Sequence, residues 1–395
     1  MTADPIVIVG AKRTPMGGFQ GDLAGLSASE LGGAAIRAAL ADAGVDPASV
    51  DQSVMGCVLG AGQGQAPARQ ATLKAGLPES VSATTVNKMC GSGMKAVMDA
   101  HDALRVGSAD VIVAGGMESM TNAPYLLPKA RGGYRMGHGQ VLDHMFLDGL
   151  EDAYDKGRLM GSFAEECARH YQFTRQAQDD YAIRSLTRAK GAIASGAFAD
   201  EIVSVTVPGR GGDIEVAIDE QPGKARPDKI PTLKAAFAKD GTVTAANASS
   251  ISDGAAALVL MRESTARDRG LTPIARILGH SVHAQAPAWF TTAPIGALEK
   301  LFARTGLTAK SVDLYEINEA FAVVAMAAIR DLDLDPETVN MYGGATALGH
   351  PIGASGARIL VTLLNALKHT GKTVGVGSLC IGGGEATALA VERLN

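Results

Sequence analysis

The sequence is short of cysteines and of long apolar runs, and each shortage excludes a class of protein. Only four cysteines occur, at positions 57, 90, 167 and 380, without CxxC spacing, so we expect neither a disulfide scaffold nor a metal site. The longest strongly apolar stretch, residues 320–329, is about half a membrane span. No basic segment precedes the first apolar run, so no signal peptide is predicted. A reducing compartment, the cytoplasm, and no membrane partner are expected.

Basic tracts are also missing from the chain. Lys and Arg number 36 against 41 Asp and Glu, a net charge of −5, and no aromatic–basic interleaving occurs, so nucleic acid is not an expected partner. What is abundant is glycine, with 48 among 395 residues against a usual share of about 7%. These glycines lie within apolar segments rather than in a low-complexity run. Packing or close approach to a ligand therefore explains them better than disorder.

One long internal repeat divides the chain. The following segments recur at an offset of 262 or 263: residues 43–51 as 305–313, Ser92-Gly93 as Ser355-Gly356, and Val111/Val113 as Val374/Val376. A repeat of this length predicts two α/β halves, residues 1–120 with 249–272 and residues 273–395, which pack together and form sites at their interface. Residues 121–248 lack a counterpart and are expected to form an inserted loop domain. It includes a helical stretch near 164–194.

Cys90 is the candidate nucleophile. It follows a β-like run at 81–86 and precedes Gly91-Ser92-Gly93 and an apolar-faced helix. A thiol at a helix N-terminus is expected to have a lowered pKa, which favours the reactive thiolate. The alternative is a small buried cysteine of the core. His101 lies on the apolar face of the same helix, and we expect it to be a core residue.

His350 and Cys380 are the other candidate reactive side chains. His350 precedes a proline and therefore lies in a loop, which the second half has lengthened by ten residues relative to the first. Ser355 is expected to cap the helix that follows. Cys380 precedes Gly382-Gly383-Gly384, a turn that makes sense if backbone amides face a ligand. A thiolate, an imidazole base and exposed amides are what cysteine-based acyl transfer requires.

Two further motifs have open interpretations. Asn318, in Asn318-Glu319-Ala320-Phe321, either caps a helix or holds a water or an oxyanion. The basic residues Lys224 and Arg226, within the segment 224–229, are either solvated or meet the phosphates of a nucleotide-like ligand.

At this point the sequence resembles the thiolase family. The resemblance rests on motifs in order along the whole chain: 86–93 around Cys90, 115–120, 318–321, 343–353 around His350 and 380–384. Four of these, at 86–93, 318–321, 343–353 and 380–384, are active-site motifs, and together they are highly specific. The resemblance implies a duplicated αβαβα layered fold with an inserted loop domain. It also implies ping-pong chemistry on coenzyme A thioesters, with no tightly bound cofactor.

The resemblance also implies a role for each motif. Cys90 takes the acyl group with His350 as its base, and Cys380 moves the α-proton of acetyl-CoA. Asn318, through a water, and His350 stabilise the enolate oxygen, while the amides of Cys90 and Gly382 hold the acyl-thioester oxygen. The expected substrate contacts are Ser249 and Met160, with Phe290, beside Trp289, closing the acyl pocket. Leu159, Tyr342 and Glu385 depart from the residues usual in the family.

The implied activity is reversible Claisen condensation of two acetyl-CoA to acetoacetyl-CoA and CoA, with a short-chain preference. Alternatives are a broad-chain 3-ketoacyl-CoA thiolase of fatty-acid β-oxidation and a thiolase-like coenzyme A or lipid binder without turnover. A Cys–His hydrolase would leave Cys380 unexplained. Residues 131–137 resemble the family's tetramerisation loop, which predicts a homotetramer, a dimer of dimers.

Overall fold

The computed structural model describes residues 4–209 and 211–394, and a continuous sheet path made of two similar parts runs through it. The first part has the order β4 (Ser82–Val86), β3 (Gln52–Gly56), β5 (Val111–Ser119), β10 (Ser252–Arg262), β1 (Ile6–Arg13), and β2 (Gly17–Gly18) pairs with β10. Strands β5 and β10 are almost wholly buried, as expected for strands covered on both faces. Strand β10 thus returns the chain to the first half, since it pairs with β1 and β5.

The second part repeats this arrangement. Its order is β12 (Leu314–Ile317), β13 (Val374–Ile381), β14 (Glu385–Arg393), β11 (Ala275–Ala284). Strand β12 runs parallel to β13, as β3 does to β5, and the two parts join where β1 pairs with β11. Val339 forms a parallel bridge to Tyr315 in β12, in the place that β4 occupies beside β3. The repeat seen in the sequence is therefore a repeat of strand topology.

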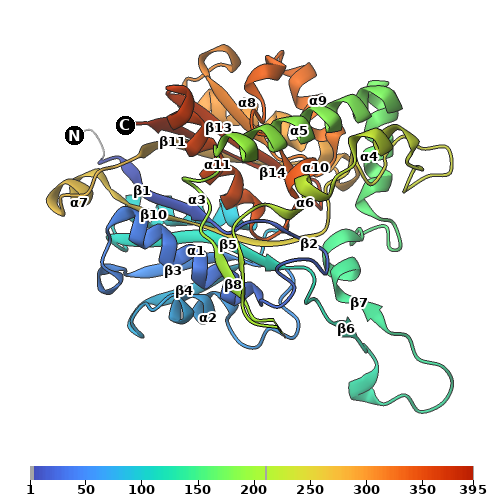
Figure 1. The fold of residues 1–395 in the computed structure, drawn as a ribbon, viewed down its shortest axis with the longest axis horizontal. Coiled ribbons are helices and arrows are strands. Elements are labelled where there is room, and N and C mark those ends of the chain that lie inside the picture. The colour runs from blue at the N-terminus through green and yellow to red at the C-terminus, as the bar shows by residue number, and fades with distance from the viewer. Residues whose placement is uncertain (1–3, 210, 395) are drawn as a thin grey trace.

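Helices complete five layers, αβαβα, as expected (Figure 1). Helices α3 (Ser92–Arg105) and α11 (Ser355–Thr370) lie between the two parts of the sheet and share one apolar core with both. Helices α1 (Ala28–Ala43) and α2 (Pro67–Lys74) cover the outer face of the first part, while α8 (Ala293–Thr305) and α9 (Ala322–Asp331) cover the second. A short helix, α7 (Glu263–Asp268), links β10 to β11.

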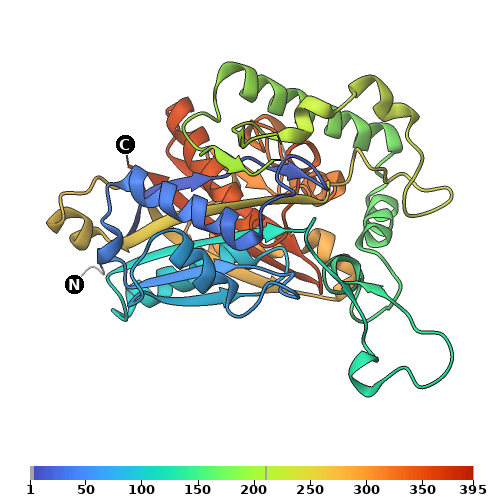
Figure 2. The same ribbon diagram turned by 60° about the horizontal axis from the view of Figure 1, so that its bottom comes forward.

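The segment between β5 and β10 covers one end of the layers (Figure 2). Its elements are β6 (Tyr125–Leu126), β7 (Leu142–Asp143), α4 (Met160–Tyr171), α5 (Arg175–Ser195), β8 (Val205–Val207), β9 (Ile214–Val216) and α6 (Glu220–Lys224). The helical stretch predicted near 164–194 is two helices, because Gln172 adopts a left-handed φ of 56° and Thr174 caps α5. The boundaries at residues 120, 248 and 272 stay predictions.

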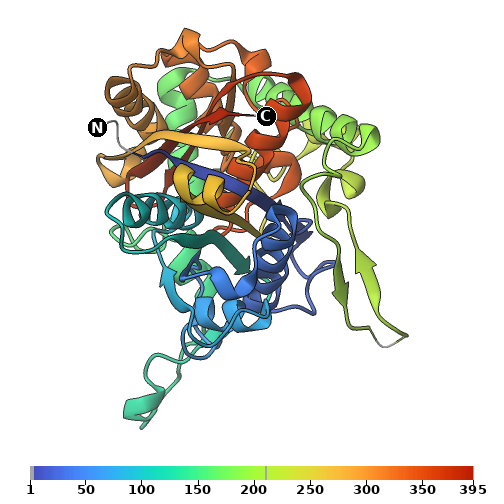
Figure 3. The same cartoon turned by 90° about the vertical axis from the view of Figure 1, so that its left-hand side faces the viewer.

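Shorter helical turns fill the connections. They are Pro47–Ser49, Ala130–Gly132, Phe146–Leu150, Pro227–Thr232, Pro287–Thr292, Ala309–Ser311, Pro336–Thr338 and α10 (Ala345–Leu348). A narrow arm that carries β6 and β7 projects away from the body in all three views (Figure 3). Among residues 4–209 and 211–394, no helix combines the length and apolar content that a bilayer crossing needs.

Helices α3 and α11 cross at their N-terminal ends, where two glycines allow backbone contact. A Cβ on Gly356 would lie 2.4 Å from the Met94 nitrogen, and one on Gly93 would lie 2.8 Å from the Ala357 nitrogen. The loops that lead into the two helices therefore meet, and they carry Cys90 and His350.

Candidate active site

Cys90 lies in the tight turn that opens α3. Met89 before it has a φ of 45°, Gly91 occupies the N-cap position, and Cys90 itself keeps partial exposure. Burial raises the pKa of the Cys90 thiol to about 11, although the backbone N–H groups of Gly382 and Cys90 act to lower it. The expectation of a pKa lowered by the helix N-terminus is therefore wrong, because desolvation of the thiolate outweighs the amides. Near neutral pH the resting group is a thiol, and it needs a base.

His350 is the candidate for that base. Its Nδ1 lies 2.6 Å from the Ser355 hydroxyl oxygen, and that hydroxyl donates to the Pro351 carbonyl at 2.9 Å. Nδ1 must then carry the hydrogen, which leaves the Nε2 lone pair free. The Nε2 atom is buried and has no partner in the described chain. Burial, with a smaller effect of Arg358, lowers the pKa of His350 to about 3, so the imidazole is neutral.

Ser355 was expected to cap α11, and that interpretation is wrong. Ala354 occupies the N-cap position, and no side chain caps the helix. The Ser355 hydroxyl instead fixes the tautomer of His350. Sequence reasoning missed this role, and the available signal was the spacing of five residues between the two, across a proline turn.

Cys380 lies near the end of β13 and is buried. Burial, with a smaller effect of Cys90, raises its pKa well above the usual range. The two cysteine segments touch, because a Cβ on Gly91 would lie 2.4 Å from the Ile381 Cδ1. After Ile381 the chain turns through Gly383 and Gly384 with φ values of 94° and 89°, which glycine adopts without strain. This turn lets the Gly382 N–H reach the Cys90 sulfur.

Asn318 adjoins Cys380 through the sheet. Its backbone N–H donates to the Ser378 carbonyl at 2.9 Å, two residues before Cys380. Helix α9 begins at Ala322, so the capping interpretation of Asn318 is wrong. The side chain is buried, and both its oxygen and its nitrogen lack a partner among residues 4–209 and 211–394. Buried amides are normally hydrogen-bonded, so these two atoms indicate a place for a water or a substrate group.

Glu319 connects the Asn318 segment to neighbouring elements through hydrogen bonds. Its carboxylate, which is fully buried, accepts hydrogen bonds from the following groups: the Tyr181 hydroxyl at 2.9 Å, the Ser185 hydroxyl at 2.8 Å, the Asn340 amide at 2.9 Å, and the Thr346 N–H at 3.1 Å and hydroxyl at 2.6 Å. It therefore ties the Asn318 segment to α5 and to the loop that leads to His350. The motif 318–321 pointed to this residue, but its role was not predicted.

Glu118 holds the other side of the His350 loop. Its carboxylate accepts the N–H groups of Val58 and Gly353 at 3.0 Å and of Leu59 at 3.2 Å. Burial raises its pKa to about 7, while these N–H donors lower it. The motif at 115–120 thus acts by positioning loops.

An apolar cluster adjoins Cys380 on the side of the insertion. It contains Phe163, Phe290 and Phe321 around Cys380, and the Met160 sulfur lies 3.6 Å from the position a Cβ would take on Gly382. The structure therefore brings Met160 and Phe290 to the predicted site. Trp289 contacts His170 instead and lines a separate hollow with Gln285.

A cavity of about 320 Å³ adjoins the site and reaches the predicted basic segment. Its lining includes Arg226, Lys229 and Ser250, whose carbonyl accepts the His350 N–H at 3.1 Å. Ser249, next to Ser250, donates its backbone N–H to Ala320 at 2.9 Å. Lys224 does not line this cavity. It is exposed and pairs with Glu220 and with Asp22, so the structure does not bring it to the site.

The structure places Glu385, Tyr342 and Leu159, three departures from the family pattern, in different surroundings. Glu385 forms an ion pair with Lys88, which links the two halves on either side of Cys90 and Gly382. Tyr342 packs edge-on against Phe198, and Leu159 directly precedes α4. None of them takes the place of a reactive group.

Known proteins give an independent comparison. The family model "Thiolase, N-terminal domain" matches residues 6–264, and "Thiolase, C-terminal domain" matches residues 271–393. Acetyl-CoA acetyltransferase 2 of Arabidopsis thaliana is 54% identical over 393 residues, which cover 98% of this chain and 97% of the relative. Acetyl-CoA acetyltransferase of Escherichia coli (strain K12) is 51% identical over 391 residues, covering 98% and 99%.

Solved structures agree with this result. The Acat5 thiolase of Ascaris suum, determined in complex with coenzyme A, superposes with a TM-score of 0.94 at 42% identity. The superposition covers 99% of this chain and 100% of that one. Fold, sequence and the order of the motifs therefore agree, and this chain belongs to the thiolase family.

Proposed function

We propose that this protein is an acetyl-CoA C-acetyltransferase, which condenses two acetyl-CoA to acetoacetyl-CoA and CoA and catalyses the reverse cleavage. The observation that carries the assignment is the set of buried atoms without partners, His350 Nε2 and both amide atoms of Asn318, beside two cysteines. A hydrolase needs one nucleophilic cysteine, and a binding protein needs no unpartnered base. The paired cysteines therefore favour a carbon–carbon bond-forming acyltransferase.

In the first half-reaction, Cys90 is the nucleophile. His350 Nε2 takes the thiol proton as the sulfur attacks the thioester carbonyl, and the same nitrogen returns the proton to the departing CoA thiolate. The N–H groups of Cys90 and Gly382 stabilise the oxyanion. The turn of three glycines supports this role, because it directs the Gly382 N–H toward the Cys90 sulfur.

In the second half-reaction, Cys380 acts as the base. The Cys380 thiol first gives its proton to His350 Nε2, and the resulting thiolate removes the α-proton of the second acetyl-CoA. The Nε2–H of His350 and a water held on Asn318 then stabilise the enolate oxygen, and His350 finally passes this proton to the Cys90 thiolate. The α-carbon then attacks the acetyl carbonyl on Cys90, and the Cys90 thiolate leaves. The proximity of the Asn318 and Cys380 segments, joined at 2.9 Å through Asn318 and Ser378, supports this assignment.

The substrates on this account are acetyl-CoA, acetoacetyl-CoA and CoA, with no tightly bound cofactor. Arg226 in the 320 Å³ cavity supports a phosphate-binding role for this segment, and Ser249 is the proposed coenzyme A contact beside it. A guanidinium suits phosphate because it donates in a planar fork. Lys224 contributes only long-range charge, since its ammonium already pairs with carboxylates.

The proposed chain-length preference is short. The rings around Cys380, Phe290 among them, fill volume that a long acyl chain would need. We place the protein in a reducing compartment, the cytoplasm, since all four cysteines are free. We also propose a homotetramer, a dimer of dimers, built through the projecting arm.

A direct assay tests the function. CoA-dependent cleavage is measured for 3-ketoacyl-CoA substrates of four, six, eight and ten carbons. The four-carbon substrate should give the highest kcat/KM, with a graded fall because each methylene changes binding by only about 1–3 kcal/mol. Equal kcat/KM for four and ten carbons would favour the β-oxidation enzyme instead. Absence of cleavage with every substrate would favour a binding protein.

A further inference from the structure

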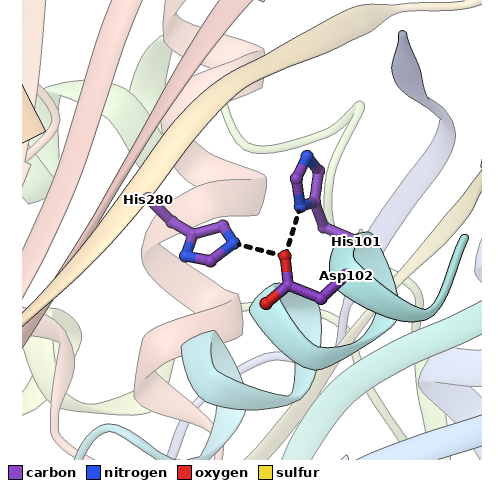
Figure 4. A group of neighbouring side chains, drawn as sticks. All are labelled: His101, Asp102 and His280. Carbon is purple, nitrogen blue, oxygen red and sulfur yellow. Dashed lines mark hydrogen bonds and ion pairs between the residues drawn. The ribbon is translucent and has the colours of Figure 1, made fainter. Parts of the chain in front are cut away.

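A cluster of metal-ligating side chains lies at the far end of α3 from Cys90. His101 and Asp102 belong to this helix, and His280 belongs to β11 (Figure 4). One carboxylate oxygen of Asp102 lies 2.9 Å from His101 Nδ1 and 2.9 Å from His280 Nε2. His101 was expected to be a core residue, but its side chain keeps 15% exposure. The proposed acyl transfer uses none of these three groups.

The three ligand atoms lie close enough together for one ion to reach all of them. They all lie within 4.8 Å of one another, and the rings stand nearly perpendicular, at 88°. Around a tetrahedral Zn²⁺ with bonds of about 2.0–2.2 Å, ligand atoms lie about 3.4 Å apart. Opening the two 2.9 Å contacts by about 0.5 Å therefore makes room for the ion.

The Asp102 carboxylate supplies negative charge at this position, with the Arg105 and Arg304 side chains nearby. Among residues 4–209 and 211–394, the Asp102 carboxylate has no Lys or Arg partner; its contacts are the two imidazoles. Asp102 keeps 60% exposure, so a water can complete the coordination. The frame is fixed, because Arg304 donates to the His280 carbonyl at 3.0 Å and β11 pairs along its length with β14.

We propose that His101, Asp102 and His280 bind one divalent transition-metal cation, with Zn²⁺ as the representative ion. Two imidazoles and one carboxylate with an open position suit Zn²⁺ and its neighbours in the Irving–Williams series. The bound ion ties α3, from the first half, to β11, from the second. The clamp thus fixes the helix whose opposite end carries Cys90.

Titration with Zn²⁺ tests the site. Isothermal calorimetry on the wild-type protein should show one Zn²⁺-binding event. Asp102→Asn and His280→Gln should each weaken Zn²⁺ binding by at least about 10–100-fold, which is the usual cost of losing an outer-shell partner. His369→Gln is the matched control, because His369 also contacts an aspartate, Asp200 at 3.5 Å, but without a second imidazole. Its affinity should equal that of the wild type. Equal Zn²⁺ affinity in wild type, Asp102→Asn and His280→Gln would overturn the proposal.

Co²⁺ separates this site from the active-site thiols. A thiolate ligand gives an intense sulfur-to-cobalt charge-transfer band, whereas the proposed nitrogen and oxygen ligands give only weak ligand-field bands. The ligand-field bands should be lost in His280→Gln. Bound Co²⁺ that shows only the thiolate band would place the metal at Cys90 or Cys380 and contradict the proposal.

Thermal unfolding gives a readout independent of activity. Zn²⁺ at 100 times its Kd should raise Tm by about 3 °C in the wild type, because it binds only the folded state. Because the Asp102 side chain is exposed, Asp102→Asn should fold normally and have the same metal-free Tm as the wild type. Zn²⁺ should not raise its Tm. An equal Zn²⁺-induced rise in the Tm of Asp102→Asn would refute the proposed metal site.

Discussion

Cys90 and Cys380 carry the same functional group, and their surroundings at the residue scale assign them different work. Cys90 keeps partial exposure as a residue, and its sulfur accepts the N–H of Gly382. Cys380 is buried against Phe290 and its neighbours, and burial raises its pKa well above the usual range. A thiolate formed there is a strong base, since its conjugate acid is weak.

Substitution of Cys380 separates these roles. Cys380→Ser should still form the acetyl-enzyme at Cys90 yet lose condensation and cleavage by at least about 10²–10⁴-fold, the usual contribution of a positioned base. Deuterium exchange into the methyl group of acetyl-CoA, followed by mass spectrometry, should fall with it. Exchange at the wild-type rate in this variant would mean that another group removes the α-proton.

Phe290 should set chain length. Phe290→Ala opens volume beside Cys380. The ratio of kcat/KM between the four- and eight-carbon substrates should therefore decrease by about 10–200-fold, equivalent to about 1–3 kcal/mol, while the four-carbon rate changes little. Trp289→Ala is the matched control, since Trp289 contacts His170 at the separate hollow. Its chain-length profile should stay that of the wild type. A destabilised Phe290→Ala with an unchanged profile would make Phe290 a core residue only.

At this scale the sequence predicts which residues are reactive better than it predicts their pKa values and hydrogen-bond partners. Residue type and glycine context pointed to Cys90, His350 and Cys380. The pKa of Cys90 was predicted in the wrong direction, because desolvation depends on neighbours such as Ile381 that are distant in sequence. Ser355 was misread for a local reason: a serine at a helix start can bond either its own helix or a side chain before it.

At the scale of elements, the crossing of α3 and α11 positions the site. Gly356→Ala would place a Cβ 2.4 Å from the Met94 nitrogen, which belongs to backbone and cannot rotate away. The helices must separate, which should cost about 1–3 kcal/mol of unfolding free energy and lower kcat by moving Cys90 relative to His350. Urea unfolding and the cleavage assay measure the two effects.

Gly191→Ala in α5 is the control for that substitution. Apart from its chain neighbours and its own helix backbone, no atom of residues 4–209 and 211–394 lies within 4 Å of the position that the new Cβ would take. Stability should therefore stay the same or rise by up to about 1 kcal/mol. If Gly356→Ala behaved like this control, the close crossing would not position the site.

The repeat made these elements predictable, and its exceptions mark where prediction failed. Ser92-Gly93 and Ser355-Gly356 recur because each helix needs a glycine where the other crosses it. The insertion has no repeat to guide it, and the helical stretch predicted there did not include the break at Gln172 between α4 and α5. A left-handed glutamine carries little local signal, since glycine is the usual residue for that conformation.

At the scale of the whole molecule, the arm between β6 and β7 is the part that the body does not cover. Met136 on it is 98% exposed, and Leu127 and Val141 are 52% and 61% exposed. Exposed apolar side chains gathered on one projection are typical of an interaction surface. This composition supports the proposed tetramer.

Light scattering after gel filtration tests the assembly. The wild type should have the mass of four chains, and Met136→Glu should shift it toward two, because the contact would then bury a charge. Val106→Glu is the control, since Val106 is 80% exposed at the end of α3, away from the arm. A wild-type mass below four chains, or four chains in Met136→Glu, would contradict the tetramer built through this arm.

The central claim is that Cys90 carries the acyl group, and one measurement tests it most directly. The protein is incubated with acetyl-CoA labelled in the acetyl group, digested, and the labelled peptide is identified by mass spectrometry. The label should lie on Cys90 in the wild type and in Cys380→Ser, and it should be absent from Cys90→Ala, which has no nucleophile at that position. Label on Cys57, Cys167 or Cys380 in place of Cys90, or undiminished labelling of Cys90→Ala, would contradict the account.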